Sequence, residues 1–205
     1  MKREQQRLFK QLDKELSDII NKYSKQYKFK KKDNFVWVSK KDFFFCISFH
    51  LGVTEKDEIL ICSGSERCKP LWTDNLLWEI MEMNECLSAQ MSLRGNGAFT
   101  FHGLPYNSTS IKIDNWKAEE IEEAVCRMIS DFDKYVNSFS DELFYENTDK
   151  IKYHDTLYEL LYLIHLEDYE KAYSFANEMT AVRFVNKGKK FTEYAMDYCK
   201  HKMNV

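Results

Sequence analysis

Hydrophobic positions near the N-terminus recur every three to four residues. Over residues 3–27 the positions that keep this spacing are Leu8, Leu12, Leu16, Ile19, Ile20 and Tyr23. Lys, Arg, Glu and Gln fill most of the positions between them. This is the period of one face of an α-helix, so the spacing predicts an amphipathic helix over 3–27. The Lys-rich run at 28–33 ends the pattern.

The next part of the chain has the pattern of β-strands. Residues 35–38 alternate in character, residues 43–51 are almost continuously apolar, and residues 58–62 form a third short apolar run. Short polar breaks separate the runs, which predicts an antiparallel meander whose middle strand is buried on both faces. The segment 63–72 reads as irregular. Two further strand signals follow, a hairpin around Gly95-Asn96-Gly97 within 90–101 and a short strand at 111–113.

Helical periodicity dominates the rest of the chain. Thr73 is the expected N-cap of a helix through Met83, and Asp114 or Asn115 is the expected cap of a long central helix. The apolar stripe of that central helix consists of Trp116, Ile121, Val125, Met128, Phe132, Tyr135 and Phe139. Further helices are predicted over 153–165, 167–180 and 190–203, with a break at 186–188.

The order of these elements predicts an α+β fold. We expect a mostly antiparallel sheet of five or six strands, packed by the N-terminal helix and the long central helix. Residues 1–140 are expected to form this sheet domain, and 141–205 a C-terminal helical extension packed on it. The 205 residues contain only 6 Gly and 2 Pro, which favours long helices over an all-β design.

Cysteine usage and the N-terminus indicate a cytoplasmic protein. The 6 Cys form no C-x-x-C pair, and the first ten residues contain no apolar signal region. No stretch approaches the roughly 18 apolar residues of a membrane span. The spacing of Cys62 and Cys68 is not that of a zinc site, so we predict no metal and no cofactor.

Charge is distributed unevenly along the chain. Residues 1–41 contain 13 Lys and Arg against 5 Asp and Glu, whereas residues 114–178 contain 6 against 17. Such asymmetry indicates either a partner of opposite charge or basic ends that pack against the acidic middle.

No catalytic motif is present, and we predict no catalytic residue. The G-x-S-x-G, H-E-x-x-H and P-loop patterns are all absent. Cys68, between Arg67 and Lys69, is the best candidate nucleophile, with His50 or His102 as its base. An enzyme with an unrecognised site near Cys68, Arg94 and His102 therefore remains an alternative. The carboxylates of the central helix are expected to face solvent, where they are poor general acids: Glu119, Glu120, Glu122, Glu123, Asp131 and Asp133.

A nucleic-acid-binding protein is a second alternative. Its candidate segment is 22–41, in which eight lysines are interleaved with Tyr23, Tyr27, Phe29 and Trp37. The acidic balance of the whole chain, with a net charge of −3, counts against it.

Protein binding is the third class considered. Trp, Tyr and Arg dominate interface hot spots, and several of these residues gather in the middle of the chain. The candidate binding residues are Arg67, Trp72, Trp78, Arg94, His102 and Tyr106. The competing interpretation is that these side chains pack at the edge of the sheet, above all for Trp78, which lies on a predicted helix.

Two motifs resemble a large bacterial family of uncharacterised domains. Phe29-Lys30-Lys31-Lys32 followed by Phe35-Val36-Trp37 is similar to that family's strand entry, which follows an N-terminal helix. Ile111-Lys112-Ile113 and the acidic helix that ends in Tyr135 and Phe139 are similar to its second motif. The resemblance covers residues 5–140, and Lys28 stands where the family usually has Gly.

The resemblance implies an antiparallel sheet between two helices and a role without chemistry. Domains related to the resembled family are found among proteins assigned as immunity proteins of bacterial toxin systems. The leading hypothesis is therefore a non-catalytic intracellular binding protein with a protein partner, specifically an immunity-like inhibitor of a protein toxin. An acidic stretch suits such a role, because many nuclease toxins are basic.

Overall fold

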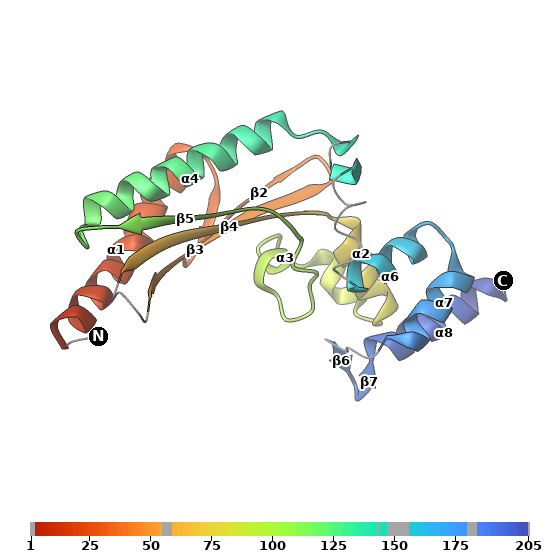
Figure 1. The fold of residues 1–205 in the computed structure, drawn as a ribbon. Coiled ribbons are helices and arrows are strands. Elements are labelled where there is room, and N and C mark those ends of the chain that lie inside the picture. Colours follow the sequence, from red (N-terminus) through yellow and green to blue (C-terminus); the bar gives the residue numbers. More distant parts are fainter. Residues whose placement is uncertain (1–2, 55–58, 143, 147–155, 180–183, 205) are drawn as a thin grey trace. The chain divides into compact units, whose positions relative to one another are not determined.

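The computed structural model in Figure 1 has the predicted α+β fold. It describes residues 3–54, 59–142, 144–146, 156–179 and 184–204. The chain divides into two compact units, each made of two segments. Unit 1 is Met1–Cys68 with Gly103–Phe139, and unit 2 is Lys69–His102 with Ser140–Val205.

Unit 1 is a five-stranded antiparallel sheet with two long helices. The strands lie in the order β1 (Lys30–Lys32), β2 (Phe35–Lys40), β3 (Phe43–Val53), β4 (Leu60–Pro70) and β5 (Leu104–Ile113). The helices are α1 (Arg3–Gln26) and α4 (Ala118–Ser138). In Figure 1 both helices run along the same face of the sheet.

The core of unit 1 lies between this face and the two helices. Phe29 meets Phe132 of α4 edge-on at 5.1 Å, and Phe45 of β3 meets Phe139 at 4.8 Å. Gly64 of β4 lies under α4 so closely that a Cβ atom there would be 2.7 Å from the sulfur of Met128. The predicted apolar stripe of α4 therefore forms the contact with the sheet.

Helix α1 ends in a left-handed residue that is not glycine. Lys28 has a φ of 61°, its N–H bonds to the carbonyl of Lys25 at 3.1 Å, and the next N–H bonds to Ser24 at 2.8 Å. This pair of bonds is a Schellman motif, with Lys28 at the position that glycine usually occupies.

Unit 2 is built mainly from helices. They are α2 (Trp72–Ile80), the 3-10 helix η1 (Asn84–Ser88), α3 (Leu93–Asn96), α6 (Thr156–His165), α7 (Tyr169–Glu178) and α8 (Phe191–Met203). A two-stranded ladder, β6 (Val185–Asn186) and β7 (Lys189–Lys190), precedes α8. Its turn, Lys187-Gly188, has positive φ at both residues, which explains the predicted break at 186–188.

Residues 69–102 belong with the C-terminal helices rather than with the predicted sheet domain 1–140. Helix α2 contacts both α6 and α8. The side chain of Asn186 donates to the carbonyl of Met81 at 3.0 Å, and Tyr198 donates to Glu79 at 2.9 Å. Long-range contacts of this kind leave no periodic signal in the sequence.

Two strand predictions in the middle of the chain are wrong. The segment 63–72 is not irregular, because β4 continues to Pro70 and pairs with β5 up to Cys68. The Gly95-Asn96-Gly97 signal is not a hairpin turn. It lies at the end of α3, where the N–H of Gly97 bonds to the carbonyl of Leu93 at 2.7 Å.

Several helix boundaries also differ from the prediction. Helix α4 begins at Ala118 with Lys117 as its N-cap, several residues after Asp114 and Asn115. Helix α2 begins at Trp72 and ends at Ile80, before the predicted Met83. Residues 153–155 and 180, at the ends of two predicted helices, and Glu58, at the start of a predicted strand, lie outside the described residues.

Candidate functional site

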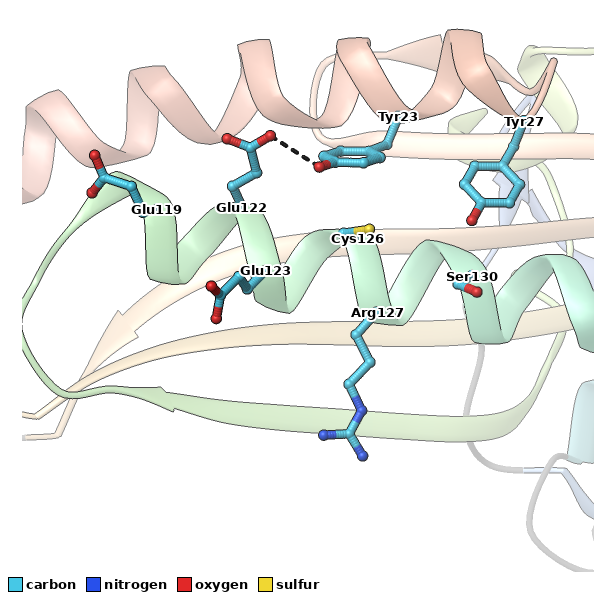
Figure 2. Close-up of a pocket in the computed structure, with 8 residues that line it drawn as sticks. All are labelled: Tyr23, Tyr27, Glu119, Glu122, Glu123, Cys126, Arg127 and Ser130. Atoms are coloured by element: carbon cyan, nitrogen blue, oxygen red, sulfur yellow. Dashed lines mark hydrogen bonds between the residues drawn. The ribbon is translucent and has the colours of Figure 1, made fainter.

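A groove lies between α1 and α4, within the described part of unit 1. Its volume is about 570 Å³. The residues that line it are Tyr23 and Tyr27 of α1 and Glu119, Glu122, Glu123, Cys126, Arg127 and Ser130 of α4 (Figure 2). Three of the eight are carboxylates and two are tyrosines, so the groove is acidic and aromatic.

Helical spacing explains why these side chains share one groove. Tyr23 and Tyr27 are four residues apart, and each α4 residue of the groove has another groove residue three or four positions away along the helix. Side chains at these spacings lie on one side of a helix. The sheet-facing stripe of α4 holds the helix in place, which turns the next stripe toward α1.

Tyr23 and Glu122 join the two walls of the groove. The hydroxyl of Tyr23 donates to Glu122 Oε1 at 2.9 Å, and the ammonium group of Lys22 bonds to the same oxygen (Figure 2). Hydrogen bonds from Lys22 and Tyr23 lower the pKa of Glu122. The same hydrogen bond to Glu122, with burial as a weaker cause, raises the pKa of Tyr23. Glu122 is thus held ionised and Tyr23 is held neutral.

This arrangement is poorly suited to acid–base or nucleophilic chemistry. A carboxylate whose oxygen already accepts two donors is a weak general base, and a phenol with a raised pKa is a weak acid near neutral pH. Cys126 lies next to both groups, and a cysteine nucleophile requires electropositive surroundings. The groove is therefore better suited to binding than to catalysis.

Two carboxylates of the groove remain open to a ligand. Glu119 and Glu123 are exposed, and within the described part of the chain neither makes a hydrogen bond or an ion pair. In Figure 2 Glu119 projects from α4 on the side of α1, whereas Glu123 and Arg127 both extend from α4 away from α1. Sequence analysis interpreted these carboxylates only as a solvated face, because the pairing of α1 with α4 is not visible in the sequence.

Of the six predicted binding residues, Arg67 and Tyr106 lie in unit 1. Arg67 is half-buried on β4. Tyr106 stacks on Tyr135 of α4 with 3.7 Å between ring centroids, beside the buried Glu66. Its hydroxyl is near Glu66 but has no hydrogen-bond partner among the described residues.

Glu66 is a buried acid that sequence analysis missed. It is 2% exposed, and its Oε1 accepts a hydrogen bond from Asn107 at 3.0 Å. Burial raises its pKa, although the neighbouring side chains of Tyr106 and Asn107 oppose that rise. A β-bulge between β4 and β5 at Glu66 and Arg67 brings Tyr106 and Asn107 to this carboxyl group.

Trp78 and Arg94 of unit 2 are packed in its interior. Trp78 is 2% exposed and donates from Nε1 to the carbonyl of Phe99 at 2.5 Å. The guanidinium group of Arg94 lies 4.6 Å from the Trp78 ring and bonds to Asn75 at 2.7 Å. These contacts agree with the competing interpretation that such side chains serve packing.

Trp72 and His102, the remaining two predicted binding residues, lie at the surface of unit 2. Trp72 is half-buried and stacks on His165, with ring centroids 4.1 Å apart and planes at 4°. His102 is exposed.

The structure counts against Cys68 as a nucleophile. The thiol is 2% exposed on a paired strand, instead of lying in an exposed loop, and burial raises its pKa. None of the 6 cysteines forms a disulfide, and Cys46, Cys62, Cys68 and Cys199 are buried. Cys126 is half-buried in the groove. Among the described residues, no group of three or more His, Cys, Asp and Glu has a geometry that would hold a metal ion.

The basic cluster of residues 22–41 is divided by the fold. Lys22 pairs with Glu122, Lys31 bonds to Ser17 of α1 at 3.1 Å, and Lys40 donates to the carbonyl of Val136 at 2.8 Å. These three lysines therefore bond to α1 or α4. Lys30 and Lys32, which alternate with Lys31 on β1, point to the opposite side of the sheet.

Comparisons with protein families, curated proteins and solved structures find no match to this chain. Within the described residues, no helix is both long enough and apolar enough to cross a membrane.

Proposed function

We propose that this chain is a non-catalytic binding protein whose α1/α4 groove accepts a basic segment of a protein partner. The observation that carries the proposal is the pair of exposed carboxylates, Glu119 and Glu123, beside two tyrosines in a groove of about 570 Å³. Carboxylates attract Lys and Arg side chains, and tyrosine faces add cation–π attraction. The resemblance to immunity-like domains supports an inhibitor of a protein toxin as the specific role. Such an inhibitor would act in the cytoplasm.

The bonding of Glu122 supports binding rather than catalysis. Lys22 of the chain itself already occupies this carboxylate, with Tyr23 as a second donor. The engagement of Glu122 by an ammonium group within the chain illustrates the chemistry that an incoming lysine would use at Glu119 and Glu123. A partner segment with two or three basic residues would complete the pairing.

The proposal is tested by comparing charge reversals inside and outside the groove. The chain and the variant Glu119→Lys/Glu123→Lys are used as bait in cytosol from the native host, and captured proteins are then titrated against each bait in purified form. We expect a basic protein that binds the wild-type chain and loses at least about tenfold in affinity with the variant. The matched control, Glu170→Lys/Glu178→Lys on α7, makes the same charge change at exposed positions and should retain binding.

Two results would reject the proposal. One is a partner whose affinity is the same for the groove variant and for the wild-type chain. The other is recovery of nucleic acid alone, with no protein whose binding depends on Glu119 and Glu123.

A further inference from the structure

Among the described residues of unit 1, α1 and α4 lie on one face of the sheet and no helix lies on the opposite face. Ile47 and Gly64 mark the helical side, because a Cβ at Gly64 would touch both Ile47 and Met128. Since side chains alternate along a strand, their neighbours Cys46, Ser48, Ser63 and Ser65 point to the other side. Cys46 and Ser63 are buried there, whereas Ser48 and Ser65 are half-buried. We call this side the open face.

Strand register then assigns the remaining residues of the open face. Directly paired residues point the same way, and Lys30 pairs with Trp37, which pairs with Cys46. Lys32 pairs with Phe35, which pairs with Ser48. On strands β4 and β5 the pairs that lie on the same face are Ile61 with Lys112, Ser63 with Ser110 and Ser65 with Ser108. Arg67 also belongs to this face, because it follows Glu66, which points toward the helices.

The charges on this face are all positive. Lys30, Lys32, Arg67 and Lys112 lie on it, and the only carboxylate within the five strands is Glu66, which is buried on the helical side. Lys112 pairs with Asp114 beyond the end of β5 at 2.7 Å, but both side chains are more than half exposed. An exposed pair of this kind is weak and screened by salt, so an incoming anion competes for Lys112.

Hydrogen-bond donors and an aromatic ring accompany these cations. Ser108 and Ser110 are exposed, and Ser65 is half-buried. Trp37 is half-buried between the two edge lysines and the centre of the sheet, and its ring stacks on Phe44 at 5.5 Å and 20°. Cations that bind phosphates, together with an aromatic ring on which a base stacks, are the features of single-strand-binding surfaces.

The carboxylates of the groove and the cations of the open face lie on opposite sides of the sheet, so the acidic net charge of the chain does not argue against an anionic ligand on the open face. The carboxylates of α4 that line the groove lie on the helical layer, on the opposite side of the sheet from Lys30 and Lys32. The field at a surface depends on the nearest charges, and charges beyond about 10 Å are largely screened at ordinary salt. The net charge of −3 therefore does not describe the open face.

We propose that the open face of the sheet binds single-stranded nucleic acid, with Lys30, Lys32, Arg67 and Lys112 on phosphates and Trp37 against a base. Unpaired bases are required, because the bases inside a duplex present no free face to Trp37. This surface is separate from the α1/α4 groove, and it is independent of the function proposed for that groove.

The test is a titration of the full chain into labelled oligouridylate and oligothymidylate of about 15 nucleotides, within the usual site sizes for such surfaces. We expect saturable binding whose logarithmic salt slope is about −2 to −3, the value for three or four phosphate contacts on a single strand. Comparison of the two oligonucleotides distinguishes RNA from DNA. A duplex of the same length should bind at least about fivefold more weakly, since it offers no base to stack.

Variants locate the binding to the open face. Lys30→Glu/Lys32→Glu/Arg67→Glu should weaken binding by at least about tenfold. The matched control Lys10→Glu/Lys14→Glu/Lys25→Glu reverses three exposed charges on α1 and should change affinity by less than about twofold. Trp37→Phe should abolish the quenching of tryptophan fluorescence by the oligonucleotide. Phe is preferred to Ala at this position because it keeps an aromatic ring against Phe44.

Several results would overturn this inference. They are the absence of saturable binding at about 50 mM salt, equal losses in the two triple variants, and equal affinity for duplex and single strand. Competition by polyglutamate at the same charge concentration, with no change in Trp37 fluorescence, would identify an acidic protein segment as the occupant instead.

Discussion

Lys69 places its ammonium nitrogen 2.8 Å from a carboxylate oxygen of Asp74, and both side chains are almost completely buried. The same ammonium group bonds to the carbonyls of Arg94, at 2.6 Å, and Phe101. Asp74 accepts the N–H of Phe101 at 2.9 Å as well. Burial raises the pKa of Asp74, while Lys69, that N–H and Arg94 oppose the rise. One ion pair therefore connects the beginning, the middle and the end of segment 69–102.

We predict that Lys69→Met destabilises the protein by about 3–5 kcal/mol, because it leaves a buried carboxylate without its main partner. Urea unfolding followed by near-ultraviolet circular dichroism measures the loss, since Trp72 and Trp78 report on unit 2. Lys134→Met is the control. Lys134 pairs with Asp131 on the surface of α4, so its loss should change the urea midpoint far less than Lys69→Met does. Equal effects of the two substitutions would contradict the structural role assigned to Lys69.

The ion pair also shows why sequence analysis divided the chain differently. Periodicity detects apolar stripes, and it correctly predicted α1, α4 and the middle strand β3 as core elements. Segment 69–102 is instead organised by Lys69, Asp74 and Arg94, which count as polar positions in any such pattern. Its assignment to the C-terminal helices could not be predicted. Charged residues are rarely buried unless they are paired, and the sequence does not show which residues pair.

The candidate site was predictable in part. The sequence identified the basic helix with its tyrosines and the acidic helix separately. The two helices contact each other through Tyr23 and Glu122, which are 99 positions apart in the chain. A contact of this kind depends on the tertiary structure and cannot be read from the sequence. The predicted binding residues also differ in burial, which the sequence does not show. The side chains of Trp78 and Arg94 are packed inside unit 2, whereas the other predicted binding residues are half-buried or exposed. An isolated Trp or Arg looks the same in a sequence whether it binds a partner or packs in a core.

The strained end of α1 gives a second prediction. Lys28→Gly should stabilise the protein by about 0.5–1 kcal/mol, because glycine adopts a φ of 61° without a Cβ clash. Lys25→Gly, three residues earlier within the helix, should destabilise by about 1 kcal/mol. Thermal melts of the two variants should therefore shift in opposite directions, and a shift in the same direction would refute the assignment.

Glu66 gives a third prediction, on pH dependence. Burial raises its pKa above the ordinary 4.5, so its contribution to stability is fully present below pH 4.5 and is lost as pH rises through the folded-state pKa. Glu66→Gln cannot ionise and still accepts the hydrogen bond from Asn107. We expect the variant to gain stability relative to wild type between about pH 4 and pH 7, measured as the difference in urea midpoints. A difference that does not change with pH would contradict a pKa of Glu66 that is raised by burial.

Glu122 should show the opposite sign in the same experiment. Lys22 and Tyr23 lower its pKa below 4.5, so its contribution is present above pH 4.5 and is lost as pH falls through the folded-state pKa. Glu122→Gln should therefore lose stability relative to wild type at neutral pH, and the difference should shrink in acid. Opposite trends at the two glutamates would separate the effect of burial from the effect of a hydrogen-bonded cation.

The stack of His165 on Trp72 gives the last prediction. Partial burial lowers the pKa of His165 below 6.5, so its contribution to stability is complete above pH 6.5 and is lost as pH falls through the folded-state pKa. His165→Phe keeps a flat ring on Trp72 and cannot take up a proton. Its urea midpoint should therefore fall less than that of wild type between about pH 7.5 and pH 5. His201→Phe, an exposed position on α8, is the control and should follow the wild-type curve. If instead the wild-type chain gained stability in acid relative to His165→Phe, the attraction of a protonated imidazole for the Trp72 ring would exceed the cost of burying its charge, and the sign assigned here would be wrong.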